Sequence, residues 1–287
     1  MLMNLKDMLA VAEENDFTVG AYNVTESSML RAVVETAEKL QAPAIIAAAT
    51  NEFEFAEPEF YEYAKARLLH SDIPFCLHLD HGHSFSDCMK AIRAGFTSVM
   101  IDGSLLPYEE NVALTAKVVE AAHEVDVSVE AEIGTIGANS DSEEGGVEGI
   151  TYTDPSDVVD FTERTGVDAL AIAIGTAHGQ YPKGFVPQLR LDLIAEVRGL
   201  VDTPLVLHGG SGNPDEEIER GCELGLRKVN ISSDFKVAYY RAVKAYLEAN
   251  VGISPANVLP CGMDAVREVV EHKMGLFHCI GKASCYR

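Results

Sequence analysis

The feature that most constrains this chain is a repeated alternation of short apolar runs with segments of helical periodicity. Eight runs have the composition of buried strands, and they span residues 17–23, 43–50, 74–80, 97–102, 127–134, 168–175, 204–209 and 228–232. Helix-like segments follow them near residues 25–41, 58–70, 84–94, 108–124, 155–165, 190–200, 214–224 and 233–249. Continuously apolar strands that alternate with helices are typical of a parallel sheet covered by helices.

Eight such units in a chain of 287 residues predict a closed (β/α)8 barrel, the TIM barrel. An open doubly wound sheet more often stops at about five or six strands. We also expect an amphipathic helix within the first 17 residues and an additional C-terminal helix over 262–277. Because no low-complexity linker divides the chain, we expect one domain over 1–287, with a helical extension from about residue 252.

Charge and composition limit the kinds of partner. The chain has 45 acidic and 22 basic residues, a formal net charge of −23, which disfavours nucleic acid and anionic membranes as partners. Its apolar stretches are shorter than half a membrane span, and its N-terminal segment has no signal-peptide pattern. None of the six cysteines forms a C-x-x-C pair, so we expect reduced thiols and a cytoplasmic protein.

Polar residues lie at the end of every predicted strand. In a (β/α)8 barrel, chemistry takes place where the strands end and the loops begin. The polar residues at these positions are Asn23, Thr50, Asn51, Asp80, His81, Asp102, Glu130, Glu132, His178, His208, Asn230, Ser232 and Ser233. A purely structural protein has no use for such a rim, and the sequence therefore predicts a functional site there.

Three histidines, His81, His178 and His208, follow predicted strands three, six and seven, each beside a glycine. Three imidazoles with an open fourth position form a common catalytic zinc site. The alternative for any one of them is a hydrogen-bonded polar residue near the barrel mouth, but three matching positions favour a metal. Asp80 directly precedes His81. It is either a general acid/base or a residue that orients the site or caps a helix.

Two segments rich in glycine and serine, "HGGSG" (208–212) and "NISSD" (230–234), follow the last two predicted strands. Barrels of this kind often hold a phosphate group there with backbone N–H groups and a helix N-terminus. One such segment alone resembles any flexible turn, whereas the pair favours a phosphate site. The acidic, glycine-rich segment 138–149 is either a lid or a solvated surface loop, and composition alone favours the surface loop.

The motifs "HLDHG", "SVMIDGS", "VSVEAEIG", "GTAHG", "LVLHGGSG" and "KVNIS", in this order, resemble the class II, zinc-dependent ketose-bisphosphate aldolases. That family includes the fructose-1,6-bisphosphate and tagatose-1,6-bisphosphate aldolases, and the resemblance covers residues 1–275 approximately. It implies a (β/α)8 barrel and a cytoplasmic lyase of carbohydrate metabolism, such as glycolysis, that forms a homodimer or homotetramer. The implied reaction is reversible cleavage of a ketose 1-phosphate or 1,6-bisphosphate to dihydroxyacetone phosphate and an aldehyde. The implied cofactors are Zn²⁺ and often a monovalent cation, Na⁺ or K⁺.

The resemblance also assigns roles to individual residues. It implies that His81, His178 and His208 bind zinc and that Asp80 is the acid/base at the C4 hydroxyl. The residues expected to contact the substrate are Asn23, Gly179, Gly209, Gly210, Ser211, Asn230, Ile231, Ser232 and Ser233.

Two pairs of acidic residues complete the expected site. Asp102 and Glu132 are expected to form a second metal position or to orient the metal ligands. In the family, a glutamate on the loop after the fifth strand handles the C3 proton. Glu144 is the best match and Glu143 the next.

One departure from the family concerns the distal end of the substrate. Many relatives carry Asp-Pro-Arg shortly before the last helix, and this arginine, often lent by a neighbouring subunit, binds the distal phosphate. Ala256 stands at that position here. A charged hydrogen bond to arginine is worth roughly 1.5–3 kcal/mol. We therefore expect a substrate with an uncharged or otherwise modified distal end, with the bisphosphates as the family default and Lys183 or Arg267 as alternative cations.

Two other classes of function are more distant alternatives. A zinc hydrolase on the same fold more often has an H-x-H pair on the first strand, and the first predicted strand here ends in Asn23. A binding protein that has lost catalysis is disfavoured by Asp80 and the three histidines.

Overall fold

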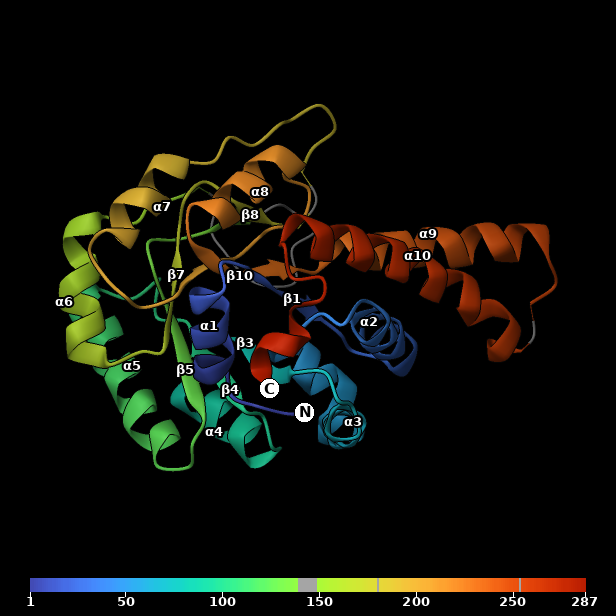
Figure 1. The fold of residues 1–287 in the computed structure, drawn as a ribbon, viewed down its shortest axis with the longest axis horizontal. Coiled ribbons are helices and arrows are strands. Elements are labelled where there is room, and N and C mark those ends of the chain that lie inside the picture. Colours follow the sequence, from blue (N-terminus) through green and yellow to red (C-terminus); the bar gives the residue numbers. More distant parts are fainter. Residues whose placement is uncertain (139–148, 180, 253) are drawn as a thin grey trace.

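The centre of the computed structural model, which describes residues 1–138, 149–179, 181–252 and 254–287, is a closed barrel of eight parallel strands (Figure 1). The strands are β1 (Val19–Asn23), β2 (Ala44–Ala49), β3 (Phe75–Gly82), β4 (Ser98–Ile101), β5 (Ser128–Ile133), β7 (Ala169–Ile172), β9 (Leu205–Leu207) and β10 (Leu226–Ile231). They follow the order β1-β10-β9-β7-β5-β4-β3-β2, and β1 pairs with β2 to close the barrel. The predicted TIM barrel is confirmed.

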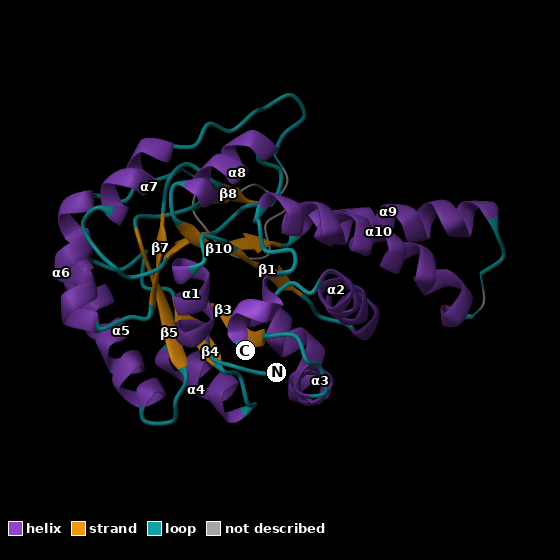
Figure 2. Cartoon of the chain, in the orientation of Figure 1, coloured by secondary structure: helices purple, strands orange, loops and turns teal. Residues whose placement is uncertain are grey.

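Helices surround the barrel and alternate with its strands (Figure 2). They are α1 (Leu5–Glu14), α2 (Ser27–Leu40), α3 (Thr50–Leu69), α4 (Phe85–Arg93), α5 (Tyr108–His123), α6 (Pro155–Thr165), α7 (Leu191–Arg198), α8 (Asp215–Glu223), α9 (Ser233–Ala249) and α10 (Pro255–Leu276), with the 3-10 helix η1 (Lys282–Tyr286) at the end. Across the described residues, no helix has both the length and the apolar character that a membrane crossing requires.

Burial on both faces explains why the strands read as continuous apolar runs. Every residue of β2, with the sequence AIIAAA, is buried. One face of such a strand packs inside the barrel and the other against the helices, so both must be apolar. Each fully buried Ile or Leu contributes about 1.5–3 kcal/mol relative to an exposed one.

Helix α1 closes the end of the barrel where the strands begin. The Asn4 side chain caps it by accepting a hydrogen bond from Asp7 N (2.9 Å), and Leu5, Met8 and Leu9 are buried. Lys6 N donates to Ser128 Oγ at the start of β5 (3.0 Å). The strands therefore open to solvent at their carboxyl ends, where the predicted polar residues lie.

Two helices begin earlier than predicted. Helix α3 starts at Thr50 instead of 58, because a short helical turn precedes a kink at Glu57 (φ 62°) and Pro58. Helix α10 starts at Pro255 instead of 262, with this proline in the first turn and Pro260 inside the helix. A proline in the first turn lacks only an N–H that would have no helical partner there.

Helices α9 and α10 pack against each other and project from the barrel as an arm (Figure 1). Only Phe235 and Tyr239 are buried in α9, whereas Tyr240 is 62% exposed and Val251, just beyond the helix, is 93% exposed. The C-terminal segment returns to the barrel, where Tyr286 OH donates to Met8 O (2.9 Å).

A small parallel sheet at the barrel mouth was not predicted. It pairs β6 (Gly137–Ala138) with β8 (Ala177–His178), and Ala138 lies opposite His178. Strand β7 ends at Ile172, so it is this small sheet that fixes the backbone of His178.

Candidate metal centre

An irregularity at the end of β3 brings two adjacent side chains to one site. In a regular strand, neighbouring side chains point to opposite faces. Here the pairing with β4 shifts register between Leu79 and Gly82, and His81 has a left-handed backbone (φ 47°). The shift lets Asp80 and His81 both face the barrel mouth, with His81 Nε2 4.0 Å from Asp80 Oδ1. Thr50 Oγ1 supports the bend by donating to His81 O (2.8 Å).

The rings of His81, His178 and His208 converge at the mouth of the barrel. Each is buried and offers one nitrogen, and these nitrogens lie within 4.8 Å of one another. The ring of His81 is centred 4.8 Å from that of His178 and 4.5 Å from that of His208. Nε2 of His81 is buried without a hydrogen-bond partner among the described residues. Such an orphaned imidazole nitrogen fits a metal ligand.

Asp102 orients the ring of His81. Its Oδ2 lies 2.8 Å from His81 Nδ1, while its Oδ1 accepts from Ser104 N (3.0 Å) and Ser104 Oγ (2.7 Å). In the neutral imidazole, a carboxylate at Nδ1 holds the ring proton on that nitrogen and leaves the lone pair on Nε2. Burial lowers the pKa of His81, but Asp80 and Asp102 outweigh it and raise that pKa to about 10. The two carboxylates therefore favour positive charge at this ring.

The carboxylate of Asp80 accepts two amide hydrogen bonds. Asn23 Nδ2 donates to Asp80 Oδ2 (2.9 Å) and Asn230 Nδ2 donates to Asp80 Oδ1 (2.8 Å). Burial raises the pKa of Asp80, but His81, His208 and Lys228 outweigh it and hold that pKa far below its ordinary value. Asp80 is thus an ionised carboxylate held in one orientation beside the three histidines.

Deeper in the barrel, His208 Nε2 lies 2.7 Å from Glu130 Oε1. Glu130 is fully buried, and Lys228 Nζ lies 3.1 Å from its Oε1. Burial raises the pKa of Glu130, but Lys228 and His208 outweigh it and lower that pKa to about 2. The neighbouring Glu132 behaves differently, because burial and Asp102 raise its pKa well above the ordinary value. The pKa values of two glutamates of one strand are thus shifted in opposite directions.

The two loops predicted to hold a phosphate lie side by side. Gly210 N donates to Asn230 O (3.0 Å), and a Cβ on Gly210 would lie only 2.7 Å from that oxygen, so the position requires glycine. Ser211 Oγ accepts from Ser232 N (3.1 Å) and Asp234 N (3.3 Å). The Ser211 side chain therefore caps α9, whose N-terminus is directed at this loop pair.

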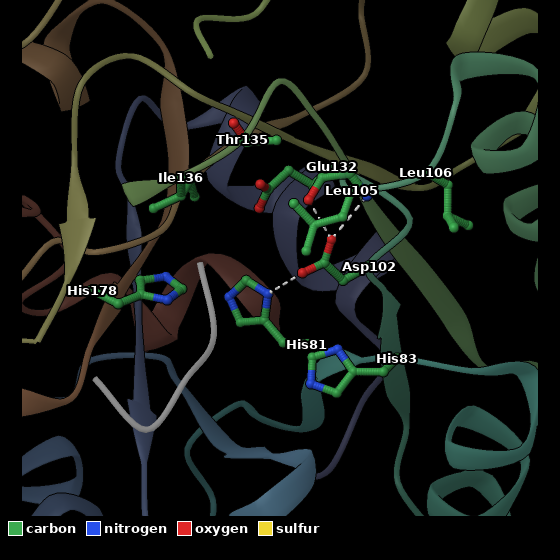
Figure 3. A pocket seen from close by; sticks show the side chains of 10 residues that line it. His81, His83, Asp102, Leu105, Leu106, Glu132, Thr135, Ile136 and His178 are labelled. Carbon is green, nitrogen blue, oxygen red and sulfur yellow. Dashed lines mark hydrogen bonds and ion pairs between the residues drawn. The ribbon is translucent and has the colours of Figure 1, made fainter. Parts of the chain in front are cut away.

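A cavity of about 280 Å³ opens beside the histidines on the β4 and β5 side (Figure 3). Figure 3 shows the rings of His81 and His178 turned toward each other at its edge, with Asp102 bound to His81. The cavity is lined by His81, His83, Asp102, Ser104, Leu105, Leu106, Glu132, Thr135, Ile136 and His178.

Comparison with known proteins identifies the family. The model of "Fructose-bisphosphate aldolase class-II" matches residues 3–282. This chain belongs to the class II fructose-bisphosphate aldolase family.

Solved structures agree with the family assignment. The YdjI aldolase from Escherichia coli K12 is 32% identical, with a TM-score of 0.87 over 99% of this chain and 100% of the other. A putative fructose-1,6-biphosphate aldolase from Coccidioides immitis is 27% identical, with a TM-score of 0.87 over 98% of each chain. Fructose-bisphosphate aldolase from Campylobacter jejuni, at 22% identity, shares the fold, with a TM-score of 0.82 over 98% of this chain and 97% of the other. Aldolases of this family are lyases that generally depend on a metal ion.

For a class II aldolase, the structure gathers most of the predicted site at one end of the barrel. The predicted residues that it places there are Asn23, Asp80, His81, Asp102, Glu132, His178, Gly179, His208, Gly209, Gly210, Ser211, Asn230, Ile231, Ser232 and Ser233. Ser233 is the first residue of α9, and Ile231, the last of β10, is a core residue. Glu143 and Glu144 lie outside the described residues.

Three polar side chains of this aldolase site were not predicted to take part, namely Lys228, Glu52 and Lys236. Lys228 is buried in the interior of the barrel. Glu52 accepts a hydrogen bond from Asn23 Nδ2 (3.2 Å) and forms an ion pair with Lys236. For Lys228 a signal existed, because it lies two residues before Asn230 in the same strand and so shares its face. Glu52 gave no signal, because the helical turn that places it was predicted as a loop.

Proposed function

We propose that this chain is a zinc-dependent aldolase that reversibly cleaves a ketose 1-phosphate to dihydroxyacetone phosphate and an aldehyde. The observation that carries the proposal is the Asp80 carboxylate, fixed by two amides, beside three converging buried histidines. A base adjacent to a Lewis acid is what cleavage of a bond between a carbinol carbon and the carbon next to a ketone requires.

His81, His178 and His208 would hold the zinc ion. Their donor set of three neutral imidazoles, with the orphaned Nε2 of His81, suits zinc with one open position. Zinc bound there supplies Lewis-acid stabilisation for the electron pair that bond cleavage leaves on the ketone half of the substrate.

Asp80 acts on the C4 hydroxyl. Both carboxylate oxygens keep lone pairs beyond the Asn23 and Asn230 bonds, so the group can accept the hydroxyl proton while its orientation stays fixed. Loss of that proton lets the C3–C4 bond break and the aldehyde leave. In the reverse direction the same group returns the proton.

The phosphate of the ketone half of the substrate binds over the loops Gly209–Ser211 and Asn230–Ser233. Because the chain has a net charge of −23, hydrogen-bond donors near the site must attract the phosphate against the overall negative field. The N-terminus of α9 and the backbone N–H groups of these loops supply such donors. A monovalent cation, Na⁺ or K⁺, beside the phosphate is part of this proposal.

The distal end of the substrate is not held by the usual arginine. Ala256 lies in the first turn of α10, on the projecting arm. Arg267 is bound to both Glu35 and Asp264, each at 2.5 Å, so its guanidinium is already engaged on the outer helices. Lys183 is exposed on the loop after β8. These observations favour a ketose 1-phosphate whose distal end carries no phosphate, with the 1,6-bisphosphates as the second candidates.

The loop after β6 supplies the carboxylate that transfers the proton at C3. Glu144 is the first candidate for this role and Glu143 the second. Replacement of Glu144 by alanine is expected to slow the exchange of the C3 proton of dihydroxyacetone phosphate with solvent about 10²-fold or more, since general acid–base steps contribute that much. The exchange is followed by NMR in deuterated water, with Glu143→Ala as the matched variant. Unchanged exchange in both variants would remove this loop from the chemistry.

We also propose a homodimer or homotetramer. The arm exposes Tyr240 (62%) and Val251 (93%), and a neighbouring copy could cover these apolar side chains. Analytical ultracentrifugation of the full chain tests this proposal, and a monomer at micromolar concentration would contradict it.

A panel of ketose 1-phosphates and 1,6-bisphosphates, assayed for release of dihydroxyacetone phosphate, tests the function. We expect cleavage that a chelator abolishes and zinc restores. The distal-end proposal is wrong if fructose or tagatose 1,6-bisphosphate has a kcat/KM within about tenfold of the best substrate, since one lost arginine contact is worth about that factor or more. Release of inorganic phosphate without carbon–carbon cleavage would indicate a hydrolase.

A further inference from the structure

A buried ion pair crosses the interior of the barrel below the metal position. Lys228 on β10 and Glu130 on β5 are both fully buried, and Lys228 Nζ lies 3.1 Å from Oε1 and 3.0 Å from Oε2 of Glu130. A lysine is almost never buried to this extent unless it is paired. The chemistry proposed above gives Lys228 no task.

One branch of contacts leads from this ion pair to a metal ligand. Glu130 Oε1 lies 2.7 Å from His208 Nε2. An ionised carboxylate can only accept, so Nε2 carries the ring proton and Nδ1 keeps the lone pair. His208 Nδ1 faces the site, 3.2 Å from Asn230 Nδ2 and 3.5 Å from Asp80 Oδ1. Glu130 thus selects the tautomer that can bind metal, and Lys228 holds Glu130 in place.

The second branch leads to the base. Lys228 Nζ donates to Asn230 Oδ1 (2.6 Å). An ammonium can only donate, so it fixes the oxygen of the Asn230 amide on its own side and turns Nδ2 toward Asp80 Oδ1, at 2.8 Å. A flipped amide would present its oxygen to the carboxylate and repel it. Lys228 therefore sets the orientation of the amide that holds the base.

We propose that Lys228 is a positioning residue that orients two groups at once, the metal ligand His208 through Glu130 and the base Asp80 through Asn230. The inference rests on the proposed function and extends it, because one buried cation orients both the metal ligand and the base. Lys228 itself touches neither metal nor substrate in this arrangement.

Lys228→Met tests the proposal, with Arg227→Met as the matched control. Methionine keeps the apolar stem but removes every donor. Arg227 is the preceding residue of β10 and is also buried, but it binds Glu13 and Asp16 away from the three histidines. Loss of a group that orients a metal ligand typically lowers metal affinity or activity about 10- to 100-fold. We expect losses in this range for Lys228→Met and values within twofold of wild type for Arg227→Met.

Three measurements separate positioning from a merely structural role. Zinc affinity is measured by chelator competition. The visible spectrum of the Co²⁺-substituted protein reports the geometry of the three-histidine site. The cleavage reaction is measured as kcat and KM for the best ketose phosphate. For Lys228→Met we expect weaker zinc binding, a shifted cobalt spectrum and a fall in kcat larger than any change in KM.

Lys228→Met alone leaves the Glu130 carboxylate buried and unpaired, which could prevent folding. The double variant Lys228→Met/Glu130→Gln removes both charges together and avoids this problem. The glutamine oxygen still accepts from His208, while Asn230 lacks its donor. We therefore expect zinc affinity and the cobalt spectrum to return toward wild type and kcat to stay low. Wild-type kcat in this double variant, or wild-type values of all three quantities in Lys228→Met, would overturn the proposal. If the wild-type protein cleaves no ketose phosphate, the proposed function fails, while the zinc and cobalt measurements still decide the role of Lys228.

Discussion

The end of the barrel that carries the three histidines has two unlike sides. On the side of β1, β3 and β10, the buried Asp80 is fixed by Asn23 and Asn230 at 2.9 and 2.8 Å. On the side of β4 and β5, the cavity is bordered by Leu105 and Leu106, which are 64% and 40% exposed. One side is a closed hydrogen-bond network and the other is open space.

The difference between the two sides follows from the elements on which their residues lie. Asn23, Asp80 and Asn230 lie on strands, whose backbone is held by the ladder of the barrel. Leu105 and Leu106 lie on the loop after β4. Catalytic geometry must be held to a fraction of an ångström, which strands can do, whereas loops can vary the shape of a cavity without disturbing that geometry. We therefore expect substitutions to have large effects on the strand side and small effects on the cavity side.

The largest effect is expected for loss of a metal ligand. His178→Ala should lose most bound zinc and fall at least about 10³-fold in kcat/KM, because Lewis-acid stabilisation is worth several kcal/mol and each 1.36 kcal/mol is tenfold. Zinc content by mass spectrometry and the cleavage assay measure both. His83→Ala is the control, since His83 lines the same cavity without joining the histidine cluster. Full zinc content in His178→Ala would contradict the ligand assignment.

Loss of the base should leave the metal in place. Asp80→Asn keeps the shape of the side chain but removes the charge, so we expect zinc content to be retained and kcat to fall about 10²- to 10⁴-fold. Zinc analysis and cleavage kinetics on the same preparation test the two halves of this expectation. If zinc leaves together with activity, Asp80 is a ligand and not the base.

A smaller effect is expected for Asp102, which touches the ligand and not the reacting atoms. Asp102→Asn removes the carboxylate on His81 Nδ1 and should weaken zinc binding about 10- to 100-fold. Chelator competition measures the affinity. Ser104→Ala, which removes one of the two hydrogen bonds from Ser104 to Asp102, serves as the milder control. An affinity equal to wild type in Asp102→Asn would show that packing alone orients His81.

The strand side was the more predictable of the two from the sequence. Periodicity predicted all eight barrel strands in order, because strands buried on both faces leave long apolar runs. Asp80 and His81 were placed at one strand end, but strict alternation would have separated them onto opposite faces. The register shift and the left-handed backbone of His81 join them, and no residue pattern predicts a bulge of this kind.

Contacts between segments distant in sequence were the least predictable. The pairing of Ala138 with His178 involves strands of two residues, too short to leave a pattern. The helical turn that carries Glu52 was not predicted, because Pro58 suggested that the helix starts there. The helix begins at Thr50 and kinks at Glu57. The bond between Lys228 and Glu130 joins strands from opposite parts of the barrel, and only the closed fold brings them together.

The smallest effect is expected on the cavity side, for Leu105→Ala. Its side chain is 64% exposed, so little apolar area is buried by it and the free energy of unfolding should change by less than about 0.5 kcal/mol. Because other residues make the hydrogen bonds that fix Asp80 and His81, kcat should stay within about twofold, and any change should appear in KM for substrates with long distal ends. Asn23→Ala, on the strand side, is the counterpart, since it removes the hydrogen bond from Asn23 Nδ2 to Asp80 Oδ2 (2.9 Å). A change in kcat for Leu105→Ala as large as that for Asn23→Ala would mean that the loop after β4, like the strands, fixes the catalytic geometry.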